Sequence, residues 1–352
     1  MTKERTYIDF IRYSITPAAS LPETIANIDW DDYMQYCNRQ GVIGLVVEGM
    51  QKADIRIPQA KLLEWIGFSE SIRAQNKTVN QRILQVQKFF EERKCRTCVL
   101  KGQANGLMYP NPEMRSPGDI DIWVEGKRED IIKMVLTIAP EAHYSIHHIK
   151  LPVFRDVSVE VHYRPMYLSN WFKDKKLQQY INEIEERQFS NKVPFEKGKI
   201  GSLTDDFNAV YQILHMYAHF FSSRNNFKQF IDYYYLLKKG LTEDEKRICA
   251  DIFRKLGIEK YASGIMWVME KVLGLETSLI VIPSNEEIGT LILKESSYFG
   301  TYSTSNLKYV LEQVKANTRI VRFFPKEVLI SPLFLVWHQW WKLKTKLALR
   351  KR

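Results

Sequence analysis

Long apolar runs are missing from this sequence of 352 residues. No run approaches the roughly 20 apolar residues that a helix needs to cross a bilayer. The first residues also lack the apolar core of a secretory signal peptide. These absences argue against a membrane-spanning or secreted protein, and we expect a cytoplasmic location.

Cysteine is scarce as well, with 4 residues in the chain. Their spacing does not form a disulfide framework, and the C-x-x-C pair of Cys95 and Cys98 has no second pair with which to complete a zinc site. Zinc or redox chemistry is one interpretation of this pair. A structural role at the start of a core strand is the interpretation that we favour.

The composition is otherwise that of an ordinary globular protein, with 45% hydrophobic and 26% charged residues. The length allows a sizeable core, in two domains or in one domain with helical additions. A formal net charge of +10 predicts an anionic partner, such as a nucleotide, a nucleic acid or an acidic membrane face. A basic surface without such a partner fits the same charge equally well.

Two acids separated by one residue stand in a segment that alternates with period two and predicts a β-strand over 119–124. On such a strand Asp119 and Asp121 project from one face, with their Cα atoms roughly 6.5 to 7 Å apart. Carboxylates this close repel each other unless a cation neutralises them, and a divalent cation that prefers oxygen ligands is the usual partner. The pair therefore predicts a metal site.

A glycine turn precedes the two acids. After a short predicted strand, Lys101 and Gly102 lead into a helix predicted over 103–108. A glycine at a strand-to-helix turn lets backbone amides approach an anion, and the positive end of the helix adds to the attraction. Lys101 and, beyond a proline-containing loop, Arg115 supply cations suited to phosphate. This stretch predicts phosphate on one side and metal on the other.

The second informative strand is predicted over 153–163. Its alternation places valines on one face and Glu160 and His162 on the other. An exposed edge-strand glutamate is the alternative interpretation of Glu160, and His162 is a weaker candidate for substrate contact. We expect the neighbouring pair His147 and His148 to lie at the surface.

The order of these motifs resembles the nucleotidyltransferases of the DNA polymerase β superfamily. The segments LKG (100–102), YPNPEMR (109–115) and DID (119–121) are similar in particular to a poorly characterised bacterial family known as uncharacterised nucleotidyltransferases. The resemblance extends over most of the chain. It implies transfer of a nucleoside monophosphate from a nucleoside triphosphate (NTP) to a hydroxyl of an acceptor, with release of pyrophosphate.

The resemblance also implies roles for single residues. Glu160 matches the position of the third acid of the superfamily, which would complete the metal site and deprotonate the acceptor hydroxyl. The superfamily usually has Ser or Gly where this sequence has Gln103. The expected ligands of Mg²⁺, with Mn²⁺ as an alternative, are Asp119, Asp121 and Glu160, and the expected nucleotide-binding residues are Lys101, Gly102, Gln103 and Arg115.

The C-terminal half carries weaker candidates. His215 and His219 lie one helical turn apart, but no Glu follows His215 as the zinc motif H-E-x-x-H requires, so we favour a core or substrate-facing role. Arg224, Lys228 and Asp232 repeat every four residues. We expect their face to look into the cleft, and an exposed salt-bridged face is the alternative.

The predicted fold is α+β, with a small mixed β-sheet as the nucleotidyltransferase core between N-terminal and C-terminal helical regions. The expected domains cover residues 1–94, 95–200 and 201–352. The tail at 333–352 mixes tryptophans with lysines and arginines. It predicts either a helix packed on the body or peripheral contact with an anionic membrane at its inner face.

The expected partners are an NTP and an acceptor, which the sequence leaves open among a small molecule, a tRNA and a protein. One alternative is a toxin-like nucleotidyltransferase that modifies tRNA or protein, which the basic charge favours. Another is a catalytically degenerate nucleotide-binding or scaffold protein associated with cell-surface polysaccharide assembly. The altered turn at Gln103 and the tail favour that second alternative.

Overall fold

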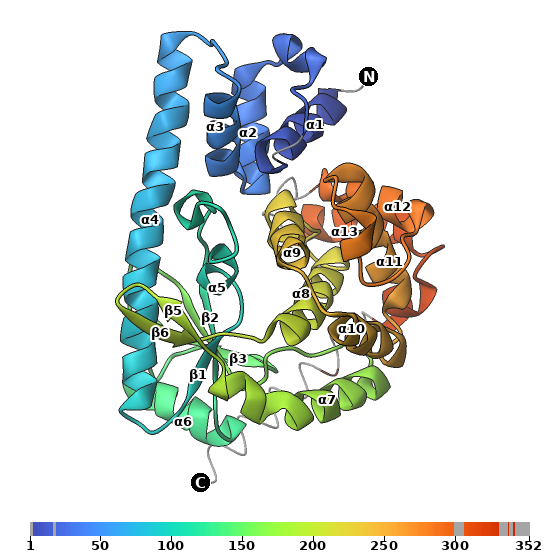
Figure 1. Cartoon of the computed structure of the whole chain (residues 1–352). Coiled ribbons are helices and arrows are strands. Elements are labelled where there is room, and N and C mark those ends of the chain that lie inside the picture. Colours follow the sequence, from blue (N-terminus) through green and yellow to red (C-terminus); the bar gives the residue numbers. More distant parts are fainter. Residues whose placement is uncertain (1–2, 17–18, 299–305, 331–336, 338–340, 342–352) are drawn as a thin grey trace.

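The computed structural model describes residues 3–16, 19–298, 306–330, 337 and 341. Figure 1 shows a small sheet, a long helix that runs from the N-terminal helices to this sheet, and a group of C-terminal helices on the opposite side. Apart from Trp337 and Trp341, the tail predicted to contact a membrane lies outside the described residues.

The main sheet has four strands in the order β1 (Thr97–Val99), β2 (Ile120–Val124), β4 (Val159–His162), β3 (His148–Lys150). Strands β2 and β4 are parallel, whereas β1–β2 and β3–β4 are antiparallel. The sheet is therefore mixed, and together with the flanking helices it confirms the predicted α+β class. Strand β4 is shorter than the strand predicted over 153–163, because its pairing begins only at Val159.

Two helices cover one face of the sheet: α4 (Gln59–Glu91) and α6 (Arg128–Ile138). The apolar periodicity of the sequence predicts both, with helices expected over 59–93 and 127–139. One apolar core joins them to the sheet. Its members include Val79, Ile83, Val86 and Phe90 from α4, Ile131, Ile132 and Val135 from α6, and Val99, Ile120, Ile122, Val124, Ile149, Val159 and Val161 from the strands.

The other face of the sheet is only partly covered. Trp123 packs against Phe189 of α7 (Trp171–Ser190), with ring centroids 4.6 Å apart. Asp121 and His162 project from the same face as Trp123, because β2 and β4 are in register with Trp123 opposite His162. This part of the sheet therefore remains open for a cleft.

The remaining elements are mostly helical. The N-terminal ones are α1 (Lys3–Ile15), the 3₁₀ turn η1 (Glu23–Asn27), α2 (Trp30–Gln40) and α3 (Ile43–Lys52). Around the sheet lie α5 (Gln103–Gly106), the 3₁₀ turn η2 (Pro112–Met114) and the hairpin β5 (Lys192–Phe195) and β6 (Gly198–Gly201). The C-terminal elements are α8 (Asp205–Phe220), α9 (Phe227–Lys239), α10 (Glu243–Lys255), α11 (Glu259–Trp267), the π-helical turn η3 (Val268–Val272), the 3₁₀ turn η4 (Thr277–Leu279), α12 (Glu286–Ser296) and α13 (Asn306–Ile320).

The N-terminal and C-terminal helices share one apolar core. Polar contacts connect the same regions, because the Gln40 amide donates to the Ser296 carbonyl (3.2 Å) and accepts from the Phe227 amide (2.9 Å). A single Gln side chain thus fixes α2 against the start of α9 and the end of α12. The N-terminal helices therefore brace the helix that carries Lys228 and Asp232.

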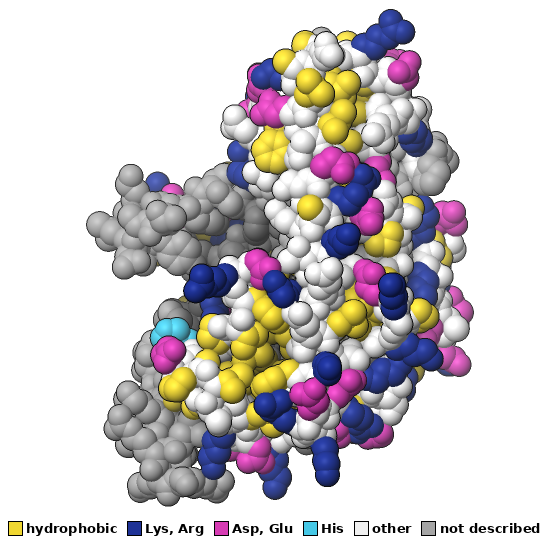
Figure 2. Space-filling model, turned by 90° about the vertical axis from the view of Figure 1, so that its left-hand side faces the viewer, with side chains coloured by type: hydrophobic (Ala, Val, Ile, Leu, Met, Phe, Trp, Pro, Cys, Tyr) yellow, Lys and Arg dark blue, Asp and Glu magenta, His cyan; other side chains and the backbone are white. Residues whose placement is uncertain are grey.

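Charges of both signs alternate on the face that α4 dominates (Figure 2). Apolar side chains also emerge there, with Leu63 61% exposed and Phe68 41% exposed. The described residues of this face therefore form no continuous basic surface of the kind that binds nucleic acid. Among the described residues, no helix combines the length and the apolar composition that crossing a membrane requires.

Candidate active site

A cleft of about 680 Å³ opens between the uncovered face of the sheet and helices α8 and α9. It collects residues that are far apart in the sequence. The residues predicted for the site that line it are Lys101, Gly102, Arg115, Asp119, Asp121, Glu160, His162, His215, His219, Lys228 and Asp232. Gln103 does not line the cleft, because its side chain is hydrogen-bonded to α4, as described below.

Asp121 and Glu160 lie directly opposite each other on the parallel strands β2 and β4. The Asp121 side chain is 3% exposed and that of Glu160 20% exposed. Burial raises the pKa of Glu160, and the neighbouring carboxylates of Asp121 and Asp119 raise it further. For Asp121, burial also acts to raise the pKa, but the Lys101 ammonium and the hydrogen bond with His162 outweigh it and hold the pKa below its usual value.

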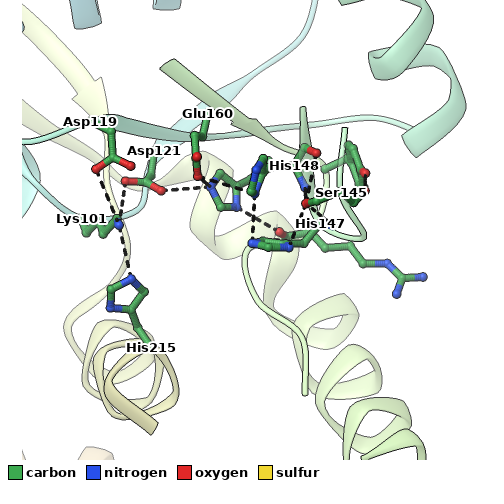
Figure 3. Close-up of polar contacts among 11 residues, drawn as sticks. Lys101, Asp119, Asp121, Ser145, His147, His148, Glu160 and His215 are labelled. Carbon is green, nitrogen blue, oxygen red and sulfur yellow. Dashed lines mark hydrogen bonds and ion pairs between the residues drawn. The ribbon is translucent and has the colours of Figure 1, made fainter. Parts of the chain in front are cut away.

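Lys101 is the counter-ion of both aspartates. Its Nζ lies 3.1 Å from Oδ2 of Asp121, 3.9 Å from Oδ1 of Asp119 and 3.3 Å from Nε2 of His215 (Figure 3). Burial acts to lower the Lys101 pKa, but the two carboxylates raise it above its usual value. The ammonium therefore stays protonated and supplies positive charge in the middle of the cleft.

The possible metal ligands around Asp121 suit a divalent cation. Oδ2 of Asp121 is buried and receives no aligned hydrogen bond from any described residue. One donor atom each from Asp121, Glu160 and His162 lies within 4.8 Å of the other two, whereas Asp119 is 40% exposed and outside this group. Two carboxylates and an imidazole, grouped around a carboxylate that Lys101 partly neutralises, fit a bound metal ion.

The prediction that His147 and His148 lie at the surface is wrong. The side chain of His148 is 16% exposed, and His147 lines the cleft. Burial lowers the pKa of His147 well below its usual value and that of His148 to about 3, with a further contribution from nearby His162. The sequence predicts a strand over 143–151 that contains both residues, but that pattern does not show that His162 packs beside them.

Arg115 and Asp232 form a buried pair rather than two separate cleft residues. The Arg115 guanidinium donates from Nε to Oδ1 (2.7 Å) and from Nη2 to Oδ2 (2.8 Å) of Asp232. The Tyr109 hydroxyl donates to the same Oδ1 at 2.6 Å. Because this carboxylate engages Nε and Nη2 together, and Nη1 lies 3.4 Å from the Ser116 carbonyl, Arg115 holds the loop before β2 against α9.

Lys228 is the cation that faces the cleft from α9. No described residue forms an ion pair with it, and its Nζ lies near Gly118, beside the acid-bearing strand. Burial lowers the pKa of Lys228 to about 8, with a further contribution from the Arg115 guanidinium. An anionic ligand bound beside this side chain would favour its protonated, charged form. Arg224, predicted on the same face, instead pairs with buried Glu295 at 3.0 Å.

The turn at Gly102 differs from the predicted phosphate-binding helix. Helix α5 has 4 residues, not the six predicted over 103–108, so its dipole contributes little at the turn. The Gln103 amide donates to Oδ1 of Asn76 at 3.1 Å and bonds to Asn80 as well. Gln103 therefore ties the turn to α4 through its side chain. Gly102 has φ 66°, a conformation that favours glycine, and a Cβ there would meet only the Asp119 carbonyl at 3.7 Å.

A line of buried amides escaped the sequence analysis. Asn208 donates to Asn105 and Gln212 donates to Asn208, each at 3.1 Å, and Asn105 approaches Asp232 at 3.5 Å. These contacts join α5, α8 and α9 at the wall of the cleft, which Asn105 and Gln212 line. A signal was present, since Asn208, Gln212 and His215 form a polar line on one side of an otherwise apolar helix.

Comparison with known proteins gives the family. The sequence profile described as "Uncharacterised nucleotidyltransferase" matches residues 26–274, which is most of the chain. The chain belongs to this family. No curated protein matches it.

Among solved structures, the chain is similar to a crystal structure of an antigenic nucleotidyltransferase-like protein from Paracoccidioides brasiliensis. The two share 13% sequence identity with a TM-score of 0.39, over 59% of this chain and 95% of that chain.

Proposed function

We propose that this protein transfers a nucleoside monophosphate from an NTP to a hydroxyl of an acceptor. The observation that carries the proposal is the pairing of Asp121 with Glu160 across β2 and β4, within a cleft that also holds Lys101 and Lys228. Acids for a metal and cations for a triphosphate are what this reaction requires. Family membership supports the same class of reaction.

The proposed metal ligands are Asp121, Glu160 and Asp119, with His162 beside them. Mg²⁺ or Mn²⁺ bound there would supply Lewis-acid stabilisation of the negative charge on the triphosphate. The grouping of ligand atoms from Asp121, Glu160 and His162 within 4.8 Å of one another supports this assignment. Asp119 is the more exposed acid, and so it can turn toward a ligand that enters from solvent.

The triphosphate is assigned to the two lysines. Lys101 lies among the carboxylates, and Lys228 reaches the same cleft from α9 without an ion-pair partner among the described residues. Together they would neutralise charge as it builds on the leaving pyrophosphate. The open backbone at Gly102 adds room for phosphate oxygens close to the main chain.

Glu160 is the proposed base. In the reaction, the acceptor oxygen forms a bond to the α-phosphorus while the bond from that phosphorus to the bridging oxygen breaks and pyrophosphate leaves. The acceptor proton passes to the Glu160 carboxylate, whose raised pKa makes it a better proton acceptor than an ordinary glutamate. The acceptor itself is a small molecule, a tRNA or a protein.

Pyrophosphate release tests this assignment. We expect the native chain with Mg²⁺ and the correct NTP to release pyrophosphate in the presence of an acceptor, and Glu160→Gln to bind the same NTP while losing at least about 100-fold in rate. Glu141→Gln, at an exposed position, serves as the matched control. Equal rates in the Glu160→Gln and control variants would contradict the assignment of the base.

One observation favours a second candidate. The Lys101 ammonium already lies 3.1 Å from Asp121 and thus neutralises part of the charge that a metal ion would neutralise. A nucleotide-binding protein without transfer activity, as in the scaffold alternative, would show this arrangement. NTP binding that neither needs a divalent cation nor leads to pyrophosphate release would favour that candidate.

A further inference from the structure

Three histidines meet beside the acidic residues, on the side away from Lys101 (Figure 3). His162 is the last residue of β4, and its register partner on β3 is His148. His147 precedes β3, and its carbonyl accepts the Tyr163 amide at 3.0 Å. The backbone pairing of β3 and β4 therefore brings the three imidazoles together at one edge of the cleft.

The ring nitrogens are spaced like the ligands of one metal ion. Nε2 of His147 and Nδ1 of His148 are 3.1 Å apart, and one donor from each of the three rings lies within 4.8 Å of the others. Oε2 of Glu160 is 3.5 Å from Nδ1 of His148 and 3.9 Å from Nε2 of His162. Ligands at about 2.0 to 2.1 Å from a tetrahedral zinc ion are roughly 3.3 to 3.4 Å from one another.

Hydrogen bonds at the far nitrogens orient two of the rings. Nδ1 of His162 lies 3.4 Å from the Arg164 carbonyl, to which only an N–H can donate. Nε2 of His162 lies 3.1 Å from Oδ1 of Asp121, a contact that is satisfied either by a ring N–H or by a cation shared between the two atoms. Nδ1 of His147 lies 3.3 Å from the Ser145 hydroxyl, which leaves its Nε2 toward His148.

The loop that carries the pair is also fixed. The Ser145 hydroxyl oxygen accepts from the backbone amides of His147 (3.4 Å) and His148 (3.3 Å). The hydroxyl of Tyr163, the residue directly after β4, donates to the Ser145 carbonyl. Metal-binding histidines characteristically have such partners, because these hold the rings in the ligating orientation.

We propose that His147, His148 and His162, with Glu160 as the oxygen ligand, bind a borderline transition-metal ion of the Zn²⁺ class. Imidazoles select Zn²⁺, Co²⁺ and related ions over Mg²⁺, which prefers oxygen ligands alone. The site adjoins the hard-cation site at Asp121 and shares Glu160 with it, so that with Zn²⁺ bound Glu160 acts as a ligand and not as the base. Its existence does not depend on nucleotidyl transfer.

Metal titration of the EDTA-treated full chain tests the proposal. We expect calorimetry to show one equivalent of Zn²⁺, and Co²⁺ to give the visible absorption of a nitrogen-ligated tetrahedral ion. His148→Gln and His147→Ala should each weaken Zn²⁺ binding by at least about 10-fold, since each removes one ligand. His143→Ala, at an exposed position in the same segment, is the matched control and should bind as the native chain does.

Far-ultraviolet circular dichroism checks that each variant is folded. If His147→Ala does not fold, His148→Gln still tests the site, because glutamine keeps a polar side chain at that position. Native protein that binds no Zn²⁺, or His147 and His148 variants that bind it like the control, would overturn the proposal. Loss of Zn²⁺ binding only in Asp119→Asn/Asp121→Asn would also overturn it, because the ion would then occupy the acidic site. None of these results depends on NTP turnover, and so failure of this proposal can be distinguished from failure of the proposed function.

Discussion

Asp121 and Glu160 are direct register partners on two parallel strands, although 38 residues separate them along the chain. Parallel pairing in this register places both carboxylates on the same face of the sheet. The two acids are thus positioned by backbone hydrogen bonds rather than by loop conformation. A site built on strands in this way keeps its geometry when a ligand enters or leaves.

The pH dependence of triphosphate binding should depend on Lys228. Its pKa of about 8 means that the ammonium is protonated below that pH and lost as the pH rises through it. We expect NTP affinity to fall between pH 7 and 9 in the native chain. In Lys228→Met we expect it to be lower by at least about 10-fold at pH 7 and to change little across this range, because a charge-assisted hydrogen bond is worth about 1.5–3 kcal/mol.

Calorimetric titration at several pH values measures this difference, with Lys238→Met, an exposed lysine on the same helix, as the control. In the ligand-free protein, the effect of Lys228 on folding stability has the opposite pH dependence. Because the folded-state pKa of Lys228 lies below that of an unfolded lysine, its contribution to the free energy of unfolding rises with pH above about 8. A Lys228→Met variant with native affinity and native pH dependence would contradict the phosphate role.

Removal of one partner of the Arg115–Asp232 pair should destabilise the fold strongly. The two side chains are 5% and 7% exposed, so Asp232→Asn leaves a buried guanidinium without its counter-ion. We expect a loss of about 3–5 kcal/mol in the free energy of unfolding. Urea unfolding measures it, with Asp251→Asn as control, because Asp251 is 73% exposed and its pair with Arg254 contributes at most about 1 kcal/mol. Equal losses in the two variants would show that the buried pair is not structural.

The turn at Gly102 should not tolerate a side chain. With φ 66° and ψ −115°, an L-residue there is strained, and we expect Gly102→Ala to cost about 1–3 kcal/mol. Gly67→Ala is the matched control, since a Cβ at that site in α4 meets nothing within 4 Å. The control should stabilise the protein by about 0.5–1 kcal/mol, because alanine favours helix. Thermal unfolding measures both changes. A shift of the two melting temperatures in the same direction would contradict this account.

Much of the sheet could be predicted because its signals are local. The alternation around Asp121 and Glu160 assigned their faces, and the apolar periodicity of α4 gave its extent to within two residues of the observed end at Glu91. Strand pairing does not follow from periodicity. The resemblance, not the pattern, suggested that the two strands contribute to one site.

The remainder of the site depends on long-range contacts. Arg115 and Asp232 are 117 residues apart, and nothing in either local sequence indicates that each neutralises the other. His147 and His148 were predicted to be surface residues of a strand, because the packing of β3 against β4 does not follow from local sequence. The hairpin β5–β6 was missed for a simpler reason, since its strands are short and Pro194 interrupts the strand pattern.

Metal-dependent nucleotide binding at Asp119 and Asp121 tests the central claim most directly. Binding and turnover of the four NTPs with Mg²⁺ would be compared among the native chain, Asp119→Asn/Asp121→Asn, and Asp244→Asn/Asp251→Asn, which removes the same charge from exposed positions. We predict Mg²⁺-dependent binding in the native chain and the exposed control, and its loss in the variant of the acid pair. Native-like binding and turnover in that variant would show that the acid pair is structural and would contradict the account.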